Sequence, residues 1–205
     1  LAALPTDGLA VIPGDSLYAQ QLRKASRAPV VTVAARASGV SADLYWSVTP
    51  SGRVELDAPG GPDRFQVQLP VPGRHNAANA ALAAALGIFR FGLAPATVVA
   101  RITAFHPLPM RWERCRSGGI EIINDAYNAN PLSMQAALEA FGDELSPGGK
   151  WLVLGDMLEL GSDADRYHAA VGVAFASRTW KGLVGVGIMA GGLVEAARQS
   201  GLPAD

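Results

Sequence analysis

Short apolar runs alternate with turn-forming residues over the first third of the chain, which is the pattern of β-strands. They predict strands at 9–12, 29–33, 42–49, 53–56 and 65–71, with one short helix at 16–22. Pro50, Ser51 and Gly52 separate two of these runs, so the sequence predicts a hairpin there.

A helical pattern begins after Pro72. The Ala-rich run 75–91 carries apolar residues at helical spacing between good helix formers. Pro95 suits the first turn of a second helix, which we expect to end near residue 105. The next segment, 106–109, reads His-Pro-Leu-Pro; it stops a helix and favours extended chain, which predicts a linker.

Strands and helices alternate regularly beyond the linker. We predict strands at 111–115, 120–124, 151–154 and 183–186, and helices at 133–145, 163–177 and 191–199. Repeated β-then-α order is typical of a parallel, doubly wound sheet. The sequence therefore predicts an α/β protein of two domains, 1–106 and 107–205.

The 205 residues include 17 basic and 18 acidic side chains, which gives a net charge of -1. This balance favours neither nucleic acid nor an anionic membrane as a partner, and no apolar run has the roughly 20 residues that span a bilayer. The single cysteine, Cys115, excludes an internal disulfide and a cysteine-based zinc site. We expect a cytoplasmic protein and a monomer.

The first polar cluster, 72–79, lies at the start of the long predicted helix, where unpaired N–H groups favour a bound anion. Asn76 and Asn79 are three residues apart, so both amides lie on one face of the first turn. A carboxamide can pair with the N6 and N7 edge of adenine. The alternative is that Asn76 caps the helix and Asn79 is only exposed.

The second polar cluster follows the strand 120–124, at the kind of strand end where α/β sheets bind ligands. Asp125 suits a ribose diol, and Tyr127 can stack or donate a hydrogen bond. The cluster adds two amides and a natural cap for the next helix, from Asn128, Asn130 and Ser133. A turn is the alternative, because Asn-Ala-Asn-Pro is rich in turn formers.

The third cluster follows the strand 151–154 and offers Asp156 and Glu159, with His168 in the next helix. Carboxylates at a strand end can hold an amine or a metal-bound water. Asp156 could equally cap the following turn, and a lone helical histidine is more often structural. Arg111, just after the linker, could contact a phosphate bound between domains; a solvated surface charge is the alternative.

In order and spacing, these motifs resemble the Mur ligases of peptidoglycan synthesis. The resemblance is carried by Pro72-Gly-Arg-His-Asn-Ala-Ala-Asn79, Pro109-Met-Arg111, Asn124-Asp-Ala-Tyr-Asn-Ala-Asn-Pro-Leu-Ser133 and Gly155-Asp-Met-Leu-Glu-Leu-Gly161. The last two segments look most similar to the family members that add D-alanyl-D-alanine to a UDP-N-acetylmuramoyl-tripeptide.

The resemblance implies that 1–106 is the C-terminal portion of a central ATPase domain and 107–205 most of a Rossmann-like C-terminal domain. Family members use ATP and Mg²⁺ to phosphorylate the carboxylate of the UDP-linked peptide, and the amine of the dipeptide then attacks the acyl phosphate. The implied nucleotide contacts are those of His75, Asn76, Asn79, Asp125, Tyr127, Asn128 and Asn130. The resemblance also implies that Arg111 reaches the γ-phosphate and that Asp156, Glu159 and His168 contact the substrates.

The sequence also departs from the family pattern. A phosphate-cradling loop needs G-x-x-x-x-G-K-[S/T], and none of the three lysines, Lys24, Lys150 and Lys181, fits it. The chain begins with Leu1 and ends after a predicted helix, so we expect a piece of a longer enzyme, with the metal ligands upstream and no ligase activity in the piece alone. Met110 stands where many relatives have Gly.

Two alternatives remain open at this point. Another Mur-type ligase, such as the diaminopimelate- or lysine-adding enzyme or cyanophycin synthetase, would share most of these motifs. A non-catalytic nucleotide-binding module is the second alternative, and the missing lysine loop favours it.

Overall fold

The structure is a computed structural model that describes residues 1–61, 64–146 and 148–201. The chain divides into two compact units, Leu1–His106 and Pro107–Asp205. Residues 202–205, which the second predicted domain includes, lie outside the described residues. Among the described helices, none has the length and apolar character needed to cross a membrane.

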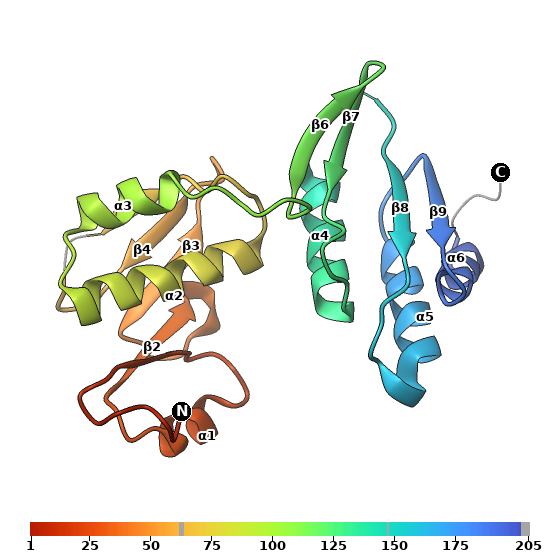
Figure 1. Ribbon diagram of the computed structural model, residues 1–205. Helices are drawn as coiled ribbons and strands as arrows, with labels where there is room; N and C mark the ends of the chain where they lie inside the picture. Colours follow the sequence, from red (N-terminus) through yellow and green to blue (C-terminus); the bar gives the residue numbers. More distant parts are fainter. Residues whose placement is uncertain (62–63, 147, 202–205) are drawn as a thin grey trace. The chain divides into compact units, whose positions relative to one another are not determined.

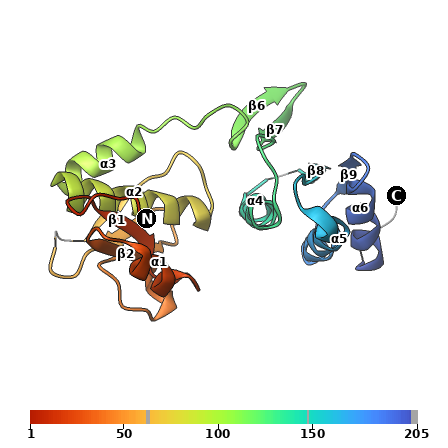
Figure 2. The same cartoon turned by 60° about the horizontal axis from the view of Figure 1, so that its bottom comes forward.

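The first unit is built on a five-stranded sheet of order β1-β2-β3-β4-β5 (Figures 1 and 2). β1, β2 and β3 pair in parallel, whereas β3, β4 and β5 pair antiparallel. The predicted hairpin around Pro50 is confirmed, because β3 pairs with β4 from Tyr45 opposite Asp57 to Val48 opposite Val54. The strands of the sheet are β1 (Ala10–Pro13), β2 (Val30–Ala35), β3 (Leu44–Val48), β4 (Val54–Asp57) and β5 (Phe65–Val67). Helix α1 (Ala19–Ala25) lies between β1 and β2 in the sequence, and the 3₁₀ turn Arg36–Ser38 lies between β2 and β3.

Two helices, α2 (Arg74–Phe91) and α3 (Pro95–Thr103), complete the first unit. The face of α2 that packs on the sheet consists of alanines, which allow the helix backbone to approach closely. Gly92 ends α2 in the left-handed conformation at φ 61°, and Pro95 starts α3. The buried residues of this core include Ala77, Ala81, Ala84 and Ala85 of α2 and Leu44, Val54, Leu56 and Val67 of the sheet.

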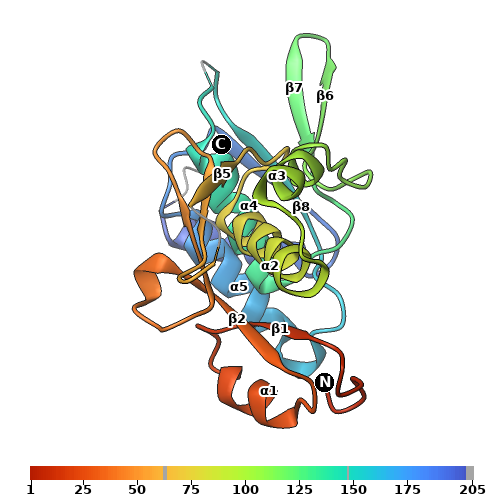
Figure 3. The same cartoon turned by 90° about the vertical axis from the view of Figure 1, so that its left-hand side faces the viewer.

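The second unit begins with a hairpin of β6 (Glu113–Ser117) and β7 (Ile120–Asn124), visible in Figure 3. The expectation of a wholly parallel sheet is wrong here, because the two strands pair antiparallel. Only Gly118 and Gly119 connect them, both at positive φ, and so short a connection cannot make a parallel crossover.

The rest of the second unit follows the predicted β-then-α order. Its elements are α4 (Pro131–Asp143), β8 (Trp151–Gly155), the 3₁₀ turn Gly161–Asp163, α5 (Ala164–Phe175), β9 (Gly182–Val186) and α6 (Ala190–Gln199). β8 and β9 pair in parallel, so their carboxyl ends meet at one edge. The α/β class of the fold is confirmed.

A separate hydrophobic core stabilises the second unit. Trp180 stacks on Phe175 and on Phe141, with ring centroids 5.0 and 5.9 Å apart. Helices α5 and α6 pack closely at Gly172, where an added Cβ would lie 2.2 Å from the carbonyl oxygen of Leu193. A side chain at residue 172 would therefore force the two helices apart.

Candidate functional site

An apolar groove of about 440 Å³ runs between α2 and α3 of the first unit. Its walls include Leu69, Val98 and Phe105, and its polar groups include Asn76 and Asn79. A mostly apolar groove with a few polar groups is the usual character of a small-molecule site. The two asparagines of the first motif thus lie in one groove, as their spacing predicts.

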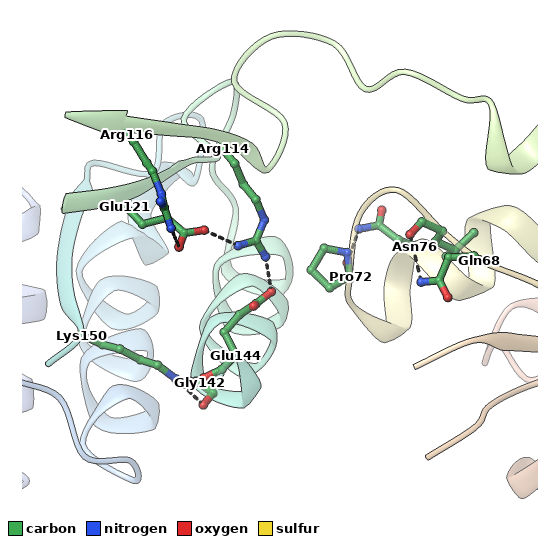
Figure 4. A network of polar contacts seen from close by, with 10 residues as sticks. Gln68, Pro72, Asn76, Arg114, Arg116, Glu121, Gly142, Glu144 and Lys150 are labelled. Carbon is green, nitrogen blue, oxygen red and sulfur yellow. Dashed lines mark hydrogen bonds and ion pairs between the residues drawn. The ribbon is translucent and has the colours of Figure 1, made fainter. Parts of the chain in front are cut away.

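The amide of Asn76 is held in place by the chain before the helix. Its Nδ2 donates to the carbonyl oxygen of Pro72 at 2.6 Å (Figure 4). Asn76 is not the N-cap of α2, because that position belongs to Gly73, so the capping alternative is wrong. Asn79 is exposed, as that alternative also proposed.

His75 is exposed and lies beside Gly73 at the start of α2. An added Cβ at Gly73 would lie 2.8 Å from Cε1 of His75, and Gly73 has a φ of 107°. The backbone conformation therefore requires glycine at this position, and the His75 ring lies against it.

The loop after β7 holds Asp125 against the segment that follows the linker. Oδ1 of Asp125 accepts the backbone N–H of Trp112 at 3.0 Å. The guanidinium carbon of Arg111 lies 4.3 Å from the ring centre of Tyr127. The second unit therefore brings Arg111, Asp125 and Tyr127 together, although they lie up to 16 residues apart in the sequence.

Asn130 and Ser133 order the start of α4. Oδ1 of Asn130 accepts the N–H of Ser133 at 2.9 Å, and Oγ of Ser133 accepts the N–H of Asn130 at 3.0 Å. This is a capping box with Asn130 as the N-cap, so the prediction that Ser133 is the cap is wrong by three residues. Asn128 is exposed, and its Oδ1 accepts the N–H of Ala129 at 2.9 Å.

An ionic network that the sequence did not reveal supports the hairpin and α4. Arg114 of β6 pairs with Glu121 of β7 and with Glu144 at the end of α4 (Figure 4). Burial alone would lower the pKa of Arg114, but the hydrogen bonds and charges of Glu121 and Glu144 outweigh it and raise the pKa above its ordinary value. Nothing in the spacing of these residues along the chain indicates the network.

Asp156, the residue after β8, forms hydrogen bonds with the backbone at the start of α6. Its two carboxylate oxygens accept the backbone N–H groups of Ala190 at 2.7 Å and Ile188 at 3.1 Å. Gly187 packs so closely that an added Cβ would lie 2.4 Å from Cγ of Asp156. The alternative that Asp156 has a capping role is therefore supported, although the capped element is α6 rather than the adjacent turn.

His168 is completely buried, and both of its ring nitrogens form hydrogen bonds. Nε2 accepts the N–H of Met157 at 2.9 Å, and Nδ1 lies 2.8 Å from the carbonyl oxygen of Ala164. A carbonyl oxygen only accepts, so Nδ1 carries the proton and the imidazole is neutral. The direct substrate contact that the resemblance implies for His168 does not fit this buried place, whereas the alternative of a structural histidine agrees with it.

Glu159 lies between Asp156 and His168 in the sequence, and its side chain is exposed. Its φ is 62°, which is rare for a residue with a side chain. Asp156 and His168 anchor the loop on either side of it. The loop thus presents the carboxylate of Glu159 to solvent, and Asp163 at the start of α5 is exposed as well.

The side chains that could bind a metal ion do not cluster in the described part of the chain. Over 1–61, 64–146 and 148–201, no group of three His, Cys, Asp or Glu side chains is arranged to hold a metal ion. We assign none of these residues to a metal.

Two family models match the chain in succession. The Mur ligase middle domain matches residues 1–87, and the Mur ligase, glutamate ligase domain matches residues 110–199. The groove with Asn76 and Asn79 lies mainly in the first matched region, whereas Arg111, Asp125 and Glu159 lie in the second.

Curated relatives with the name UDP-N-acetylmuramoyl-tripeptide–D-alanyl-D-alanine ligase are similar to this chain. The protein of Bacillus subtilis is 40% identical over 109 residues, which are 53% of this chain and 24% of that protein. The protein of Mycobacterium tuberculosis is 34% identical over 185 residues, which are 83% of this chain and 34% of that protein. The chain spans about a quarter to a third of the length of these relatives.

Solved structures agree with the family models. MurF from Acinetobacter baumannii superposes with a TM-score of 0.80 at 26% identity, over 94% of this chain and 41% of that one. MurF ligase from Thermotoga maritima in complex with ADP gives a TM-score of 0.71 at 19% identity, over 92% of this chain and 42% of that one, and shows the shared fold. With both domain models matched in order and the motifs in place, the chain belongs to the Mur ligase family.

Proposed function

We propose that this chain forms part of an ATP-dependent ligase that adds D-alanyl-D-alanine to a UDP-N-acetylmuramoyl-tripeptide. The observation that carries the proposal is the 34% identity, over 83% of the chain, to a relative that bears this name. The activity belongs to the whole enzyme, of which this chain spans a part. We place the enzyme in the cytoplasm and expect it to act as a monomer.

Asn76 and Asn79 are proposed to hold the adenine of ATP. The amide of Asn76 is oriented by its hydrogen bond to Pro72, and both asparagines line the groove beside α2. A fixed amide can accept from the adenine amine and donate to a ring nitrogen. His75, one residue before Asn76, would contact the same base.

Asp125 and Arg111 are proposed to act on the ribose and on the γ-phosphate. A carboxylate accepts hydrogen bonds from a ribose diol, and Oδ1 of Asp125 already accepts one from the Trp112 backbone. A guanidinium binds phosphoryl oxygens bidentately and stabilises charge that develops on them during transfer. Asn128 and Asn130 would line the nucleotide, and Asn130 would do so while it caps α4.

The proposed reaction has two steps. A carboxylate oxygen of the UDP-linked tripeptide attacks the γ-phosphorus, the bond to ADP breaks, and an acyl phosphate forms. The amine of D-alanyl-D-alanine then attacks the acyl carbon, phosphate leaves, and the amine loses a proton. Mg²⁺ is expected to neutralise the phosphate charge, but no residue of this chain is assigned to it.

Glu159 is the residue that we propose for direct contact with the incoming amine. It is exposed on a loop that Asp156 and His168 hold in shape. An ammonium group close to a carboxylate forms a charge-assisted hydrogen bond. Asp156 and His168 then contribute to substrate binding through the loop, not by touching the substrate.

A second candidate is a Mur ligase that adds a different residue. A relative from Arthrobacter, named UDP-N-acetylmuramate–L-alanine ligase, is 32% identical over 142 residues, which are 67% of this chain and 29% of that protein. The two names differ in both substrates: UDP-N-acetylmuramoyl-tripeptide and D-alanyl-D-alanine in the first, UDP-N-acetylmuramate and L-alanine in the second.

Substrate specificity separates these candidates. A full-length ligase that carries these residues should release ADP from ATP when it receives UDP-N-acetylmuramoyl-tripeptide and D-alanyl-D-alanine. UDP-N-acetylmuramate with L-alanine, and the UDP-linked tripeptide with L-lysine or diaminopimelate, are the matched controls and should not support release. Turnover with a single amino acid and not with the dipeptide would contradict the proposal.

A further inference from the structure

Residues 110–113 are bound to residues 124–127 through backbone and side-chain contacts. The N–H of Tyr127 donates to the carbonyl oxygen of Met110 at 3.2 Å. The N–H of Trp112 donates to Oδ1 of Asp125 at 3.0 Å. Arg111, between these two anchor points, stacks its guanidinium on the Tyr127 ring at 4.3 Å.

The backbone on both sides of Arg111 has an unusual shape. Met110 has a φ of 59° and Trp112 a φ of 55°, and both residues have side chains that disfavour the left-handed region. Such a conformation persists only where surrounding contacts hold it. Here the hydrogen bonds Tyr127 N–H to Met110 O and Trp112 N–H to Asp125 Oδ1 provide them, together with the buried Trp112 side chain, 7% exposed.

We infer that Tyr127 is a positioning residue that holds the guanidinium of Arg111 in the orientation used for phosphoryl transfer. The inference rests on the role proposed above for Arg111. An exposed arginine side chain samples many rotamers, and stacking on an aromatic face restricts them before the substrate arrives. Tyr127 then acts through Arg111, which differs from the nucleotide-lining role that the family resemblance implies.

The same contacts join the segments that carry Asp125 and Arg111. The Asp125 carboxylate holds the backbone of Trp112, the residue next to Arg111. Tyr127, whose ring contacts the guanidinium of Arg111, is two residues beyond Asp125 in the sequence. The position of the arginine is therefore set by the loop that carries the proposed ribose ligand.

Kinetics of the full-length ligase test this role by a double-mutant comparison. Tyr127→Leu should lower kcat by about 2- to 5-fold with little change in KM for ATP, since an exposed cation–π contact is weak. Tyr127→Phe keeps the ring and should restore most of the lost kcat. In the Arg111→Ala background, Tyr127→Leu should have no further effect.

Direct contact of Tyr127 with the nucleotide would give a different result. Tyr127→Leu would then raise KM for ATP, or would lower kcat by the same factor with and without Arg111, and either result would overturn the inference. Tyr18→Leu is the matched control, because Tyr18 is an exposed tyrosine, 63% exposed, just before α1 in the first unit.

A second measurement uses chain 1–205 and does not depend on ligase activity. The ring current of Tyr127 should shift the NMR resonances of the Arg111 side chain, and Tyr127→Leu should remove that shift while Tyr18→Leu preserves it. Unchanged Arg111 resonances in Tyr127→Leu would overturn the inference and leave the proposed function intact. Failure of the unmutated full-length enzyme to ligate the dipeptide would overturn the proposed function.

Discussion

His168 links α5 to the loop after β8 through its two ring nitrogens. His168→Ala would leave the buried N–H of Met157 without its acceptor and would open a cavity. We expect a loss of about 2–4 kcal/mol in the free energy of unfolding of the second unit. Amide hydrogen exchange at Met157 and along α5, compared with the unmutated chain, measures this loss.

The control for this substitution is His106→Ala, since His106 is exposed. It should change the same exchange rates by no more than about 0.5 kcal/mol. Comparable protection of the Met157 amide in His168→Ala and in the control would contradict the structural role of His168.

Met110 has a backbone conformation that favours glycine. Its φ of 59° lies in the region where glycine has no steric penalty. The carbonyl oxygen of Met110 accepts the N–H of Tyr127, and this hydrogen bond helps to hold the conformation beside Arg111.

Helix α4 ends at a site that Lys150 stabilises. Nζ of Lys150 donates to the carbonyl oxygens of Gly142 at 2.7 Å and Glu144 at 2.6 Å, groups that have no partner within the helix (Figure 4). Lys150→Met keeps most of the side-chain volume and removes both bonds. We expect the second unit to lose about 1–2 kcal/mol of stability in a denaturant titration.

Lys24→Met is the matched control for this change, because Lys24 is exposed at the end of α1 in the first unit. Its effect on the second unit should be negligible. Equal shifts of the second unit's transition in the two variants would show that Lys150 does not hold α4. This capping role also accounts for Lys150 without a phosphate-binding function.

Most helices and strands could be predicted from periodicity and turn residues alone. The alanine spacing of α2 and the prolines around 106–109 are local signals, and the structure places elements within a few residues of them. The β-then-α pattern does not predict the antiparallel β6–β7 pairing, for which the local signal is the pair Gly118 and Gly119 between the two strands.

The site was predicted less completely, since its contacts cross long stretches of sequence. The spacing of Asn76 and Asn79 and the strand-end loops are local, so the sequence indicates where polar groups gather. The partners of Asp156 lie more than 30 residues away at Ile188 and Ala190, and no local pattern shows them. The buried place of His168 likewise depends on how α5 folds back on the loop after β8.

The two units have separate cores and carry different parts of the proposed chemistry. The first contains Asn76 and Asn79, and the second contains Arg111, Asp125 and Glu159. The chain spans about a quarter to a third of the length of its curated relatives, and the chemistry proposed for it is that of the full-length ligase. We propose that Arg111 serves the phosphoryl transfer rather than ATP binding.

Steady-state kinetics of Arg111→Ala in the full-length ligase test this claim most directly. An arginine that acts on the transferred phosphate stabilises the transition state more than bound ATP, so kcat should fall by about 100-fold or more while KM for ATP changes by less than about 3-fold. Arg116→Ala, whose side chain is 82% exposed on the neighbouring strand β6, should leave both constants unchanged. A large rise in KM for ATP with kcat retained would contradict this role of Arg111.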